Sequence, residues 1–233
     1  MPALSVVLPV WNEEHRLAAG LAGLAELRRR AGTAVEAVFV DDGSTDGTLA
    51  ALRREARGDV VLAEPHRGKG AALRAGVLAA AGDRVLLADI DWSVHPGQAL
   101  LLRDVDADVV VATREGDGSR RIGEPVWRHF LGRAFNQIVQ GTVLAGHTDT
   151  QCGCKLLRRD VARALFSRLT VDGWAYDVEL LYLAHVEGHT VREVPVVWRY
   201  EADSRLRPWA DGVAMARELW KVRRNAREGA YRR

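Results

Sequence analysis

The sequence has few cysteines, and this scarcity excludes a scaffold held together by disulfides. Only Cys152 and Cys154 occur among 233 residues. Thiols one residue apart on a single segment are poorly placed to bridge each other, and no second ligand pair accompanies them to complete a zinc site. We therefore expect two reduced thiols in a cytoplasmic protein.

Long apolar runs are also missing. No stretch reaches the eighteen or so consecutive apolar residues that a transmembrane helix requires, so we expect no membrane-spanning segment. The first apolar run, LSVVLPV, is short and has no basic leader before it, which favours a strand over a signal peptide.

The chain carries little net charge. Its formal charge of +2 gives no reason to expect a nucleic-acid partner. Positive charge is concentrated in residues 217–233, whose net charge is +5. Leu219, Trp220 and Val222 lie among these cations, a pattern typical of a segment that rests on a membrane surface. The alternative is a solvated terminal helix packed on the domain, and both remain open.

Strand and helix patterns alternate through the first half of the chain. Apolar runs rich in β-branched residues predict strands at 3–10, 34–40, 59–64 and 83–90. The helices expected between them begin near Leu17, Thr48 and Gly68. Ser44 or Asp46 is a candidate cap for the second helix. Such alternation is typical of an α/β fold with a mostly parallel central sheet flanked by helices.

The second half is less regular. The elements expected there are a strand at 107–114, a polar loop at 115–125, helices at 126–140, 160–168 and 176–187, a strand or pair of short strands at 190–200, and a closing helix at 209–227. No internal repeat or low-complexity linker interrupts the pattern, so we expect a single domain, 1–233.

Each strand of the first half runs into a cluster of polar residues. The clusters read WNEE, DDGSTD, HRGKG and DIDWS in chain order. Ligands of an open parallel sheet bind at the carboxyl ends of its strands, so we expect the four clusters to share one site. Asp89 and Asp91 would repel each other unless a positive charge lies between them. Because carboxylate oxygens suit Mg²⁺ and Mn²⁺, the pair predicts a divalent metal.

The motifs LPVWNEE, FVDDGSTDGT, HRGKGAALRAG and LLADIDWSVHP together resemble those of the family 2 glycosyltransferases, which have the Rossmann-like GT-A fold. The resemblance is greater to the catalytic domains of the polyprenyl-phosphate sugar synthases, dolichol-phosphate mannose synthase among them. DTQCGCKLL, GWAYDVELLYLA and VREVPVVW extend it to the dolichyl-phosphate β-glucosyltransferases. It covers about residues 4–200 and implies an enzyme, a hexosyltransferase.

The resemblance implies that the first half, 1–113, binds the nucleotide sugar and the metal. Asp89 and Asp91 would hold the metal, with Asp91 also catalytic, while Ser93 stands where relatives often carry Gln. The residues implied for the nucleotide and its phosphates are Pro9, Trp11, Glu13, Asp41, Asp42, Lys69, Asp89 and Ile90. Lys69 stands at a helix start, where its ammonium and the helix dipole both favour a phosphate. His66 replaces the family's usual Asn and is given no role.

The second part, 114–208, is implied to bind the acceptor, and 209–233 forms the basic C-terminal helix. Arg114 and Arg128 match catalytic-site arginines near an acceptor phosphate, and Lys155 matches a basic residue of the same site. Guanidinium forks suit phosphate oxygens, although each cation has a solvated surface charge as its alternative. Asp149 would touch the acceptor or the sugar, as a base or only as a loop hydrogen-bond partner.

Other residues have competing interpretations. Asp177 and Glu179 alternate on a helix, so we expect them on different faces, one bracing a cation and the other exposed. Trp174 and Trp198 are expected in the core rather than against a sugar, and Trp92 is a candidate for lining the acceptor groove.

The sequence therefore predicts a metal-dependent inverting glycosyltransferase, with Mg²⁺ or Mn²⁺ as cofactor, that moves glucose from UDP-glucose onto a polyprenyl phosphate at the cytoplasmic face of a membrane. GDP-mannose is the second choice of donor. Its rivals are a soluble acceptor on the same fold and a nucleotide-sugar-binding protein without turnover. A nucleotidyltransferase is disfavoured because the glycine- and arginine-rich opening loop of pyrophosphorylases is absent after the first strand.

Overall fold

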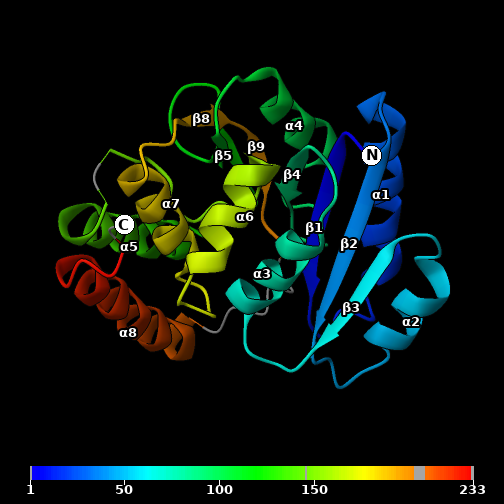
Figure 1. Ribbon diagram of the computed structural model, residues 1–233, viewed down its shortest axis with the longest axis horizontal. Coiled ribbons are helices and arrows are strands. Elements are labelled where there is room, and N and C mark those ends of the chain that lie inside the picture. The colour runs from blue at the N-terminus through cyan, green and yellow to red at the C-terminus, as the bar shows by residue number, and fades with distance from the viewer. Residues whose placement is uncertain (1, 145, 202–207, 232–233) are drawn as a thin grey trace.

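The computed structural model describes residues 2–144, 146–201 and 208–231 (Figure 1). Seven strands form one sheet in the order β3-β2-β1-β4-β7-β5-β8, and β6 pairs with β9 in a second sheet. The strands are β1 (Leu4–Val10), β2 (Val35–Asp42), β3 (Val60–Glu64), β4 (Arg84–Leu87), β5 (Val109–Thr113), β6 (Arg120–Ile122), β7 (Lys155–Arg158), β8 (Val191–Pro195) and β9 (Val197–Arg199). The helices are α1 (Leu17–Ala31), α2 (Thr48–Glu55), α3 (Lys69–Ala79), α4 (Pro96–Leu100), α5 (Val126–Thr142), α6 (Arg159–Arg168), α7 (Tyr176–Val186) and α8 (Pro208–Arg227), with a short 3₁₀ helix at Leu101–Asp104.

The large sheet is mostly parallel, as the sequence predicts. β1 pairs in parallel with β2 and β4, β2 pairs with β3, and β5 pairs with β8. The exception is β7, which runs antiparallel between β4 and β5. The sequence predicts no strand there, because KLLR is too short to show a period. This central position buries Lys155, the first residue of β7.

Helices cover both faces of the sheet. Val6 and Leu8 of β1 pack in one apolar cluster with α1 and α2, whereas Val7 packs in a second cluster with α3, α6 and α7. Figure 1 shows α1 and α2 at one end of the molecule and α5 and α8 at the other. Burial of both strand faces explains why the first strand reads as an unbroken apolar run.

Two boundaries differ from the sequence prediction, and one open alternative is decided. The predicted loop at 115–125 contains β6. Of the alternatives for 190–200, the pair of short strands is the one that forms, as β8 and β9, which belong to different sheets. β4 ends at Leu87, so Asp89 and Asp91 lie in the turn beyond it. The short helix α4 begins soon after, at Pro96. Proline fits the first turn of a helix, but five residues are too few to show an apolar period, so the sequence does not predict α4.

The end of α8 is packed, not exposed. Leu219 and Val222 are buried in the core cluster that contains α7, and only Trp220, 61% exposed, faces outward. The prediction that Leu219, Trp220 and Val222 together rest on a membrane surface is therefore wrong. Its alternative, a terminal helix packed on the domain, is confirmed. No helix in the described part of the chain is long and apolar enough to cross a bilayer.

Gly76 gives a test of how closely α3 packs on the sheet. A β-carbon at Gly76 would lie 2.4 Å from Val7 Cγ1 and 2.9 Å from Val40 Cγ2, both on stiff β-branched side chains. We expect Gly76→Ala to destabilise the protein by about 1–2 kcal/mol, because overpacking outweighs the better helix propensity of Ala. Urea denaturation measures this change.

Gly132→Ala is the matched control, since nothing lies within 4 Å of a β-carbon at Gly132 in α5. This variant should be as stable as the wild type or more stable by up to about 1 kcal/mol. If the two variants changed stability equally, close packing at Gly76 would be refuted.

Candidate active site

A cleft of about 1100 Å³ lies at the carboxyl edge of the sheet. Its walls come from the segments that follow β1, β3, β4 and β5 and from the last residue of β2, together with α5 and the first half of α8. Ligand sites of small molecules usually enclose about 300–1,000 Å³, so this cleft has room for a nucleotide sugar and part of a second substrate. The polar clusters that the sequence places at strand ends do share one site.

The segments after β1 and β2 are tied to each other. Asn12 has a left-handed φ of 55°, which its short polar side chain tolerates, and its Oδ1 accepts a hydrogen bond of 2.7 Å from Thr45 N. Asn12 N donates to Ser44 Oγ at 2.9 Å, and Glu14 Oε2 accepts from Gly47 N at 2.8 Å. Of the two candidate caps of α2, Asp46 rather than Ser44 bonds to the start of the helix, because Asp46 Oδ1 accepts a hydrogen bond from Thr48 N. These hydrogen bonds between the two segments fix the position of Pro9 and Trp11, which line the cleft.

Trp11 and His66 form a stacked aromatic pair at this edge. Their ring centroids are 4.5 Å apart and their planes differ by 12°. His66 Nδ1 lies 2.8 Å from Asp42 Oδ2, and the Asp42 carboxylate also accepts from Arg67 N at 2.9 Å and Gly68 N at 3.0 Å. Trp11, His66 and Asp42 all line the cleft. His66 is a site residue that sequence reasoning missed, although it stands in one of the polar clusters.

Asp41 takes a different position from Asp42. Its Oδ2 accepts from Ser44 N at 3.1 Å, and Asp41 does not line the cleft. A direct contact between Asp41 and a nucleotide is therefore a wrong expectation, because the side chain is buried in the turn behind β2. Its Oδ1 is a buried oxygen without a hydrogen-bond partner.

The two aspartates after β4 are each close to a cation. Lys69 Nζ lies 2.6 Å from Asp89 Oδ1, and Arg16 Nη1 lies 3.7 Å from Asp91 Oδ2. Burial together with repulsion from Asp89 raises the pKa of Asp91. Burial opposes the charge of Lys69, yet the carboxylates of Asp89 and Asp177 outweigh it and raise the pKa of Lys69. Lys69 and Arg16 thus supply positive charge beside the two neighbouring carboxylates.

Glu13 holds Arg16 in this position. The Arg16 guanidinium makes a double ion pair with the Glu13 carboxylate, with Nη2 at 2.6 Å from Oε1, and Glu13 N donates to Thr48 Oγ1 at 2.8 Å. Glu13 lines the cleft but both of its oxygens face Arg16, so its predicted contact with the nucleotide is replaced by a supporting role. Arg16 itself was not predicted, since an arginine between two motifs carries no signal of its own.

The carboxylate pair fits a divalent cation. A β-carbon at Gly153 would lie 2.5 Å from Asp89 Oδ2, so only glycine leaves that oxygen open to the cleft. Ser93 Oγ donates to Asp91 Oδ1 at 2.8 Å and orients it, which is the role found for Ser93. Among residues 2–144, 146–201 and 208–231 no cluster of three or more His, Cys, Asp or Glu side chains suits a metal. Two carboxylates match Mg²⁺ or Mn²⁺, which take further ligands from phosphates and water.

Arg114 and Asp149 form a bidentate ion pair that also lines the cleft. The distances are 2.7 Å from Arg114 Nε to Asp149 Oδ2 and 2.8 Å from Nη2 to Oδ1, and Arg114 N also donates to Oδ2 at 3.1 Å. Burial alone would raise the pKa of Asp149, but the Arg114 guanidinium outweighs it and holds that pKa well below the ordinary value for aspartate. Asp149 is therefore a poor base and serves to position Arg114.

More arginines gather around this pair. Arg121 of β6 donates to Glu124 and to Glu115, each at 2.8 Å, and Arg133 Nη1 of α5 lies 3.6 Å from Glu115 Oε2. Arg128, also on α5, has its guanidinium 5.1 Å from the ring centre of Tyr200. All four arginines line the cleft. The sequence motifs indicate Arg114 and Arg128 but not Arg121 and Arg133, because neither the short strand β6 nor this part of α5 carries a motif around these two arginines.

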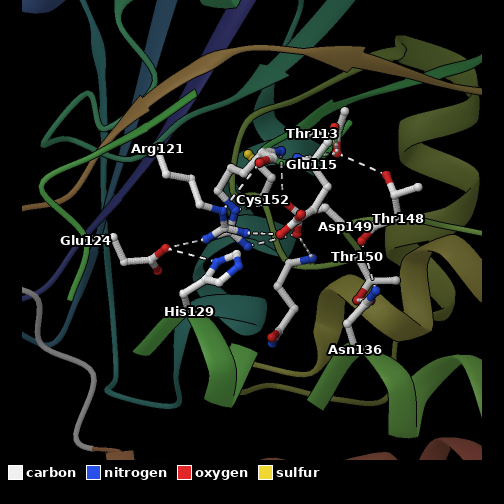
Figure 2. Close-up of polar contacts among 12 residues, drawn as sticks. Thr113, Glu115, Arg121, Glu124, His129, Asn136, Thr148, Asp149, Thr150 and Cys152 are labelled. Atoms are coloured by element: carbon white, nitrogen blue, oxygen red, sulfur yellow. Dashed lines mark hydrogen bonds and ion pairs between the residues drawn. The ribbon is translucent and has the colours of Figure 1, made fainter. Parts of the chain in front are cut away.

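Hydrogen bonds tie α5 to the segment that carries Asp149. Figure 2 shows Asn136 of α5 beside Thr150, and Thr150 Oγ1 donates to Asn136 Oδ1 at 3.1 Å. Asn136 Nδ2 also donates to Thr148 O at 2.9 Å. On the other side of Asp149, Figure 2 shows His129 of α5 and Arg121 converging on Glu124. These bonds set α5 as one wall of the site.

Lys155 does not reach the acceptor side of the cleft. It is 0% exposed, its Nζ is paired with Asp177 Oδ1, and Nζ also donates to Cys152 O at 2.6 Å. The prediction that Lys155 binds a phosphate is wrong, because β7 places this residue in the middle of the sheet, paired with Leu87 of β4 and Val111 of β5. Its charge neutralises Asp177, whose pKa is raised by burial.

The other competing interpretations are also resolved. Glu179 lies on a different face from Asp177, as predicted, but it is buried rather than exposed and accepts hydrogen bonds from Thr170 N and Val171 N. Trp174 and Trp198 are half-buried and line the cleft. Trp198 also packs against the apolar cluster that contains α1 and α2, so the core expectation is met for Trp198 in part and is wrong for Trp174. Trp92 instead turns away from the cleft, and its Nε1 donates to Gly20 O at 2.8 Å.

Two cations lie over these cleft tryptophans. Lys69 Nζ is 5.4 Å from the ring centre of Trp174, and the Arg114 guanidinium is 5.4 Å from that of Trp198. Contacts of this kind hold a cation in place while leaving its hydrogen-bond donors available.

Both cysteines are free and buried, in agreement with the expectation of reduced thiols. Burial raises the pKa of the Cys152 thiol to about 11 and that of Cys154 well above its ordinary value. Both thiols are therefore protonated at neutral pH and act as apolar packing groups next to the site.

The chain belongs to glycosyltransferase family 2, whose family model, Glycosyl transferase family 2, matches residues 5–166. It is therefore an enzyme of that family. Among its relatives is a dolichyl-phosphate beta-glucosyltransferase from Mus musculus, 33% identical over 250 residues that cover 98% of this chain and 77% of the relative. The protein of that name from Saccharomyces cerevisiae is 30% identical and the match covers 98% of this chain and 76% of the relative.

A solved structure supports the fold independently. Glucosyl-3-phosphoglycerate synthase from Mycobacterium tuberculosis, in complex with Mn²⁺, UDP and phosphoglyceric acid, has a TM-score of 0.72 and 22% identity. The match covers 95% of this chain and 77% of that one. The likeness confirms the GT-A fold that the motifs imply.

A stability measurement tests whether Lys155 and Asp177 form a buried ion pair at the centre of the sheet. We expect Lys155→Met to destabilise the protein by about 3–5 kcal/mol, because it leaves the buried Asp177 carboxylate without its partner. The double variant Lys155→Met/Asp177→Asn should recover most of this loss, since the uncompensated charge is then absent. Urea denaturation of the three proteins measures both effects. A Lys155→Met variant as stable as the wild type would contradict the assignment.

Proposed function

We propose that this enzyme is a metal-dependent inverting glycosyltransferase that moves glucose from UDP-glucose onto a polyprenyl phosphate. The observation that carries the proposal is the presence of two charge clusters in one cleft. Asp89 and Asp91 belong to one part of its lining, the donor wall, and four arginines, Arg114, Arg121, Arg128 and Arg133, belong to another, the acceptor or arginine wall. The first suits a cation that holds a diphosphate, and the second suits an anionic acceptor.

In this proposal residues 1–113 bind the donor, residues 114–208 bind the acceptor, and the basic C-terminal part, 209–233, contributes the helix α8. The donor half offers the stacked Trp11 and His66 as an apolar surface for a base, with Pro9 and Ile90 also lining the cleft. Lys69 provides a positive charge next to Asp89, at the first turn of α3, where a phosphate is favoured. The Mus musculus relative, by its name a dolichyl-phosphate glucosyltransferase, supports glucose and a lipid phosphate as the substrates.

Asp89 and Asp91 would hold the metal, as their open oxygens and the neighbouring glycine allow. When bound, a divalent cation acts as a Lewis acid that stabilises the negative charge of the departing diphosphate. Lys69 and Arg16, already beside these carboxylates, keep further positive charge near the diphosphate. The cleft walls exclude water from the anomeric carbon.

An acceptor phosphate makes a general base unnecessary. A phosphate monoester is already largely ionised at pH 7, so its oxygen can attack the anomeric carbon directly. The new carbon–oxygen bond forms as the bond to the diphosphate breaks, UDP leaves with the electron pair, and the configuration inverts. Asp149 agrees with this mechanism because its carboxylate is occupied by Arg114 and its pKa is held low.

A soluble phosphate-bearing acceptor is the second candidate. The synthase of known structure that shares this fold was solved with phosphoglyceric acid, a small anion that the arginine wall of this cleft would also suit. Lipid and soluble acceptors therefore use the same anion-binding chemistry, and only turnover separates them. GDP-mannose remains the alternative donor.

Transfer of radiolabelled UDP-glucose with Mn²⁺ and a short polyprenyl phosphate tests the proposal. We expect labelled product in the organic phase after extraction. Arg128→Gln should raise KM for the polyprenyl phosphate by about 10- to 100-fold, because a charge-assisted hydrogen bond contributes about 1.5–3 kcal/mol. KM for UDP-glucose should stay within about twofold, since Arg128 lies on the acceptor wall.

Arg120→Gln is the matched control, because Arg120 is exposed beside Arg121 and lies outside the cleft. It should leave both constants unchanged. Equal effects of Arg128→Gln and Arg120→Gln would contradict the acceptor assignment. Label that enters only a water-soluble product with phosphoglyceric acid would favour the soluble acceptor, and label from GDP-mannose alone would change the donor.

A further inference from the structure

Helix α5 buries very few of its side chains. Of its 17 residues only Val139 is buried. Its large apolar side chains Val126, Trp127, Phe130, Leu131 and Ile138 are instead between 51% and 71% exposed. They make up half of the large exposed apolar residues in the described part of the chain. A surface helix of a globular protein normally turns such side chains toward the core.

The exposed side chains of α5 form one continuous stripe. Phe130 and Leu131 stand three and four residues after Trp127, Ala134 stands four and three residues after them, and Ile138 follows four residues later, so the five lie on one side of the helix. All five are exposed. We call this set the α5 stripe. A stripe of this length would ordinarily be covered, and no other part of the described chain covers it.

The charge of α5 indicates what covers the stripe. The helix contains no Asp or Glu, whereas Arg128 and Arg133 give it positive charge. Large aromatic and aliphatic side chains beside cations are typical of a helix that lies in a membrane interface, and the cations complement anionic head groups.

The position of α5 agrees with a lipid surface. Figure 1 places α5 at the end of the molecule opposite α1 and α2. Arg128 and Phe135 line the cleft from this helix, and Leu131 and Ile138 belong both to the cleft wall and to the α5 stripe. A molecule whose phosphate reaches the arginine wall would therefore leave the cleft beside the α5 stripe. If the stripe lay on a bilayer, the lipid chain would not have to cross water.

We propose that the α5 stripe is a docking surface for a membrane with anionic head groups, which presents the open side of the cleft to the lipid. The proposal deepens the proposed function, because it rests on a lipid-phosphate acceptor for its purpose, although the surface itself does not depend on turnover. It also moves the membrane contact from α8 to α5. Among the side chains of α8 that the structure describes, 212–227, the large exposed apolar ones are Val213 and Trp220, two turns apart, with Arg224 packed over Trp220 at 5.2 Å.

Flotation with vesicles of phosphatidylcholine and about one third phosphatidylglycerol tests the surface without any donor or acceptor. We expect wild-type protein to float with these vesicles and Trp127→Gln/Phe130→Gln to lose at least about tenfold in partition, since two aromatic side chains no longer enter the interface. Neither residue lines the cleft. Both are exposed, so the melting temperature should not change.

Val213→Gln/Trp220→Gln is the matched control, with one aromatic and one aliphatic side chain of similar exposure on α8. It should bind the vesicles within about twofold of the wild type. Equal loss in both double variants, or loss only in the α8 variant, would overturn the proposal. Sedimentation of the wild type as a dimer that Trp127→Gln/Phe130→Gln abolishes would also overturn it, because a second copy would then cover the stripe.

The same variants separate this proposal from the proposed function. Vesicle binding that depends on Trp127 and Phe130, in a protein that transfers no sugar to a lipid phosphate, would support the surface and refute the acceptor. Transfer to a polyprenyl phosphate without any vesicle binding would refute the surface and leave the acceptor.

Discussion

The structure depends on the neutralisation of two carboxylates at the end of a buried strand. Asp89 and Asp91 follow β4 one residue apart, and repulsion between their like charges favours a cation beside each of them. Lys69 reaches Asp89 from the first turn of α3, and Arg16 reaches Asp91 because Glu13 holds it there. The segments after β1, β3 and β4 therefore converge on one point for an electrostatic reason, and that point is the floor of the cleft.

The two groups of charges in the cleft differ in kind. On the donor wall three carboxylates, Asp89, Asp91 and Glu13, stand against two cations, Lys69 and Arg16. On the acceptor wall four guanidinium groups, Arg114, Arg121, Arg128 and Arg133, stand among the carboxylates of Asp149, Glu115, Glu124 and Glu201. The excess of carboxylates on the donor wall suits a metal ion, and the guanidinium groups of the acceptor wall suit phosphate oxygens. A cleft with both groups can bring a diphosphate donor and an anionic acceptor together despite their mutual repulsion.

Sequence reasoning succeeded where a local pattern has a direct physical cause. Buried parallel strands read as apolar runs, and their polar ends had to meet at one edge, so the cleft and residues such as Trp11, Asp42, Lys69, Asp89 and Asp91 were predictable. Lys155 was not, because its burial follows from an antiparallel strand of four residues that only tertiary pairing creates. Arg16, Arg121 and Arg133 carry no local signal either, since an ion pair between distant segments leaves no period in the sequence. The helix at 126–140 was predicted, but its exposure was not, because a stripe of apolar residues normally predicts burial.

The measurement that tests the account most directly is a calorimetric titration of UDP into the wild type and into Asp91→Asn, each with Mn²⁺ and with EDTA. The account requires the carboxylate pair to bind the diphosphate through a divalent cation. It predicts that the wild type binds UDP at least about tenfold more tightly with Mn²⁺ than with EDTA, and that Asp91→Asn loses this difference. Equal UDP affinity of the wild type with and without Mn²⁺ would contradict it, because the two aspartates would then have no metal to hold.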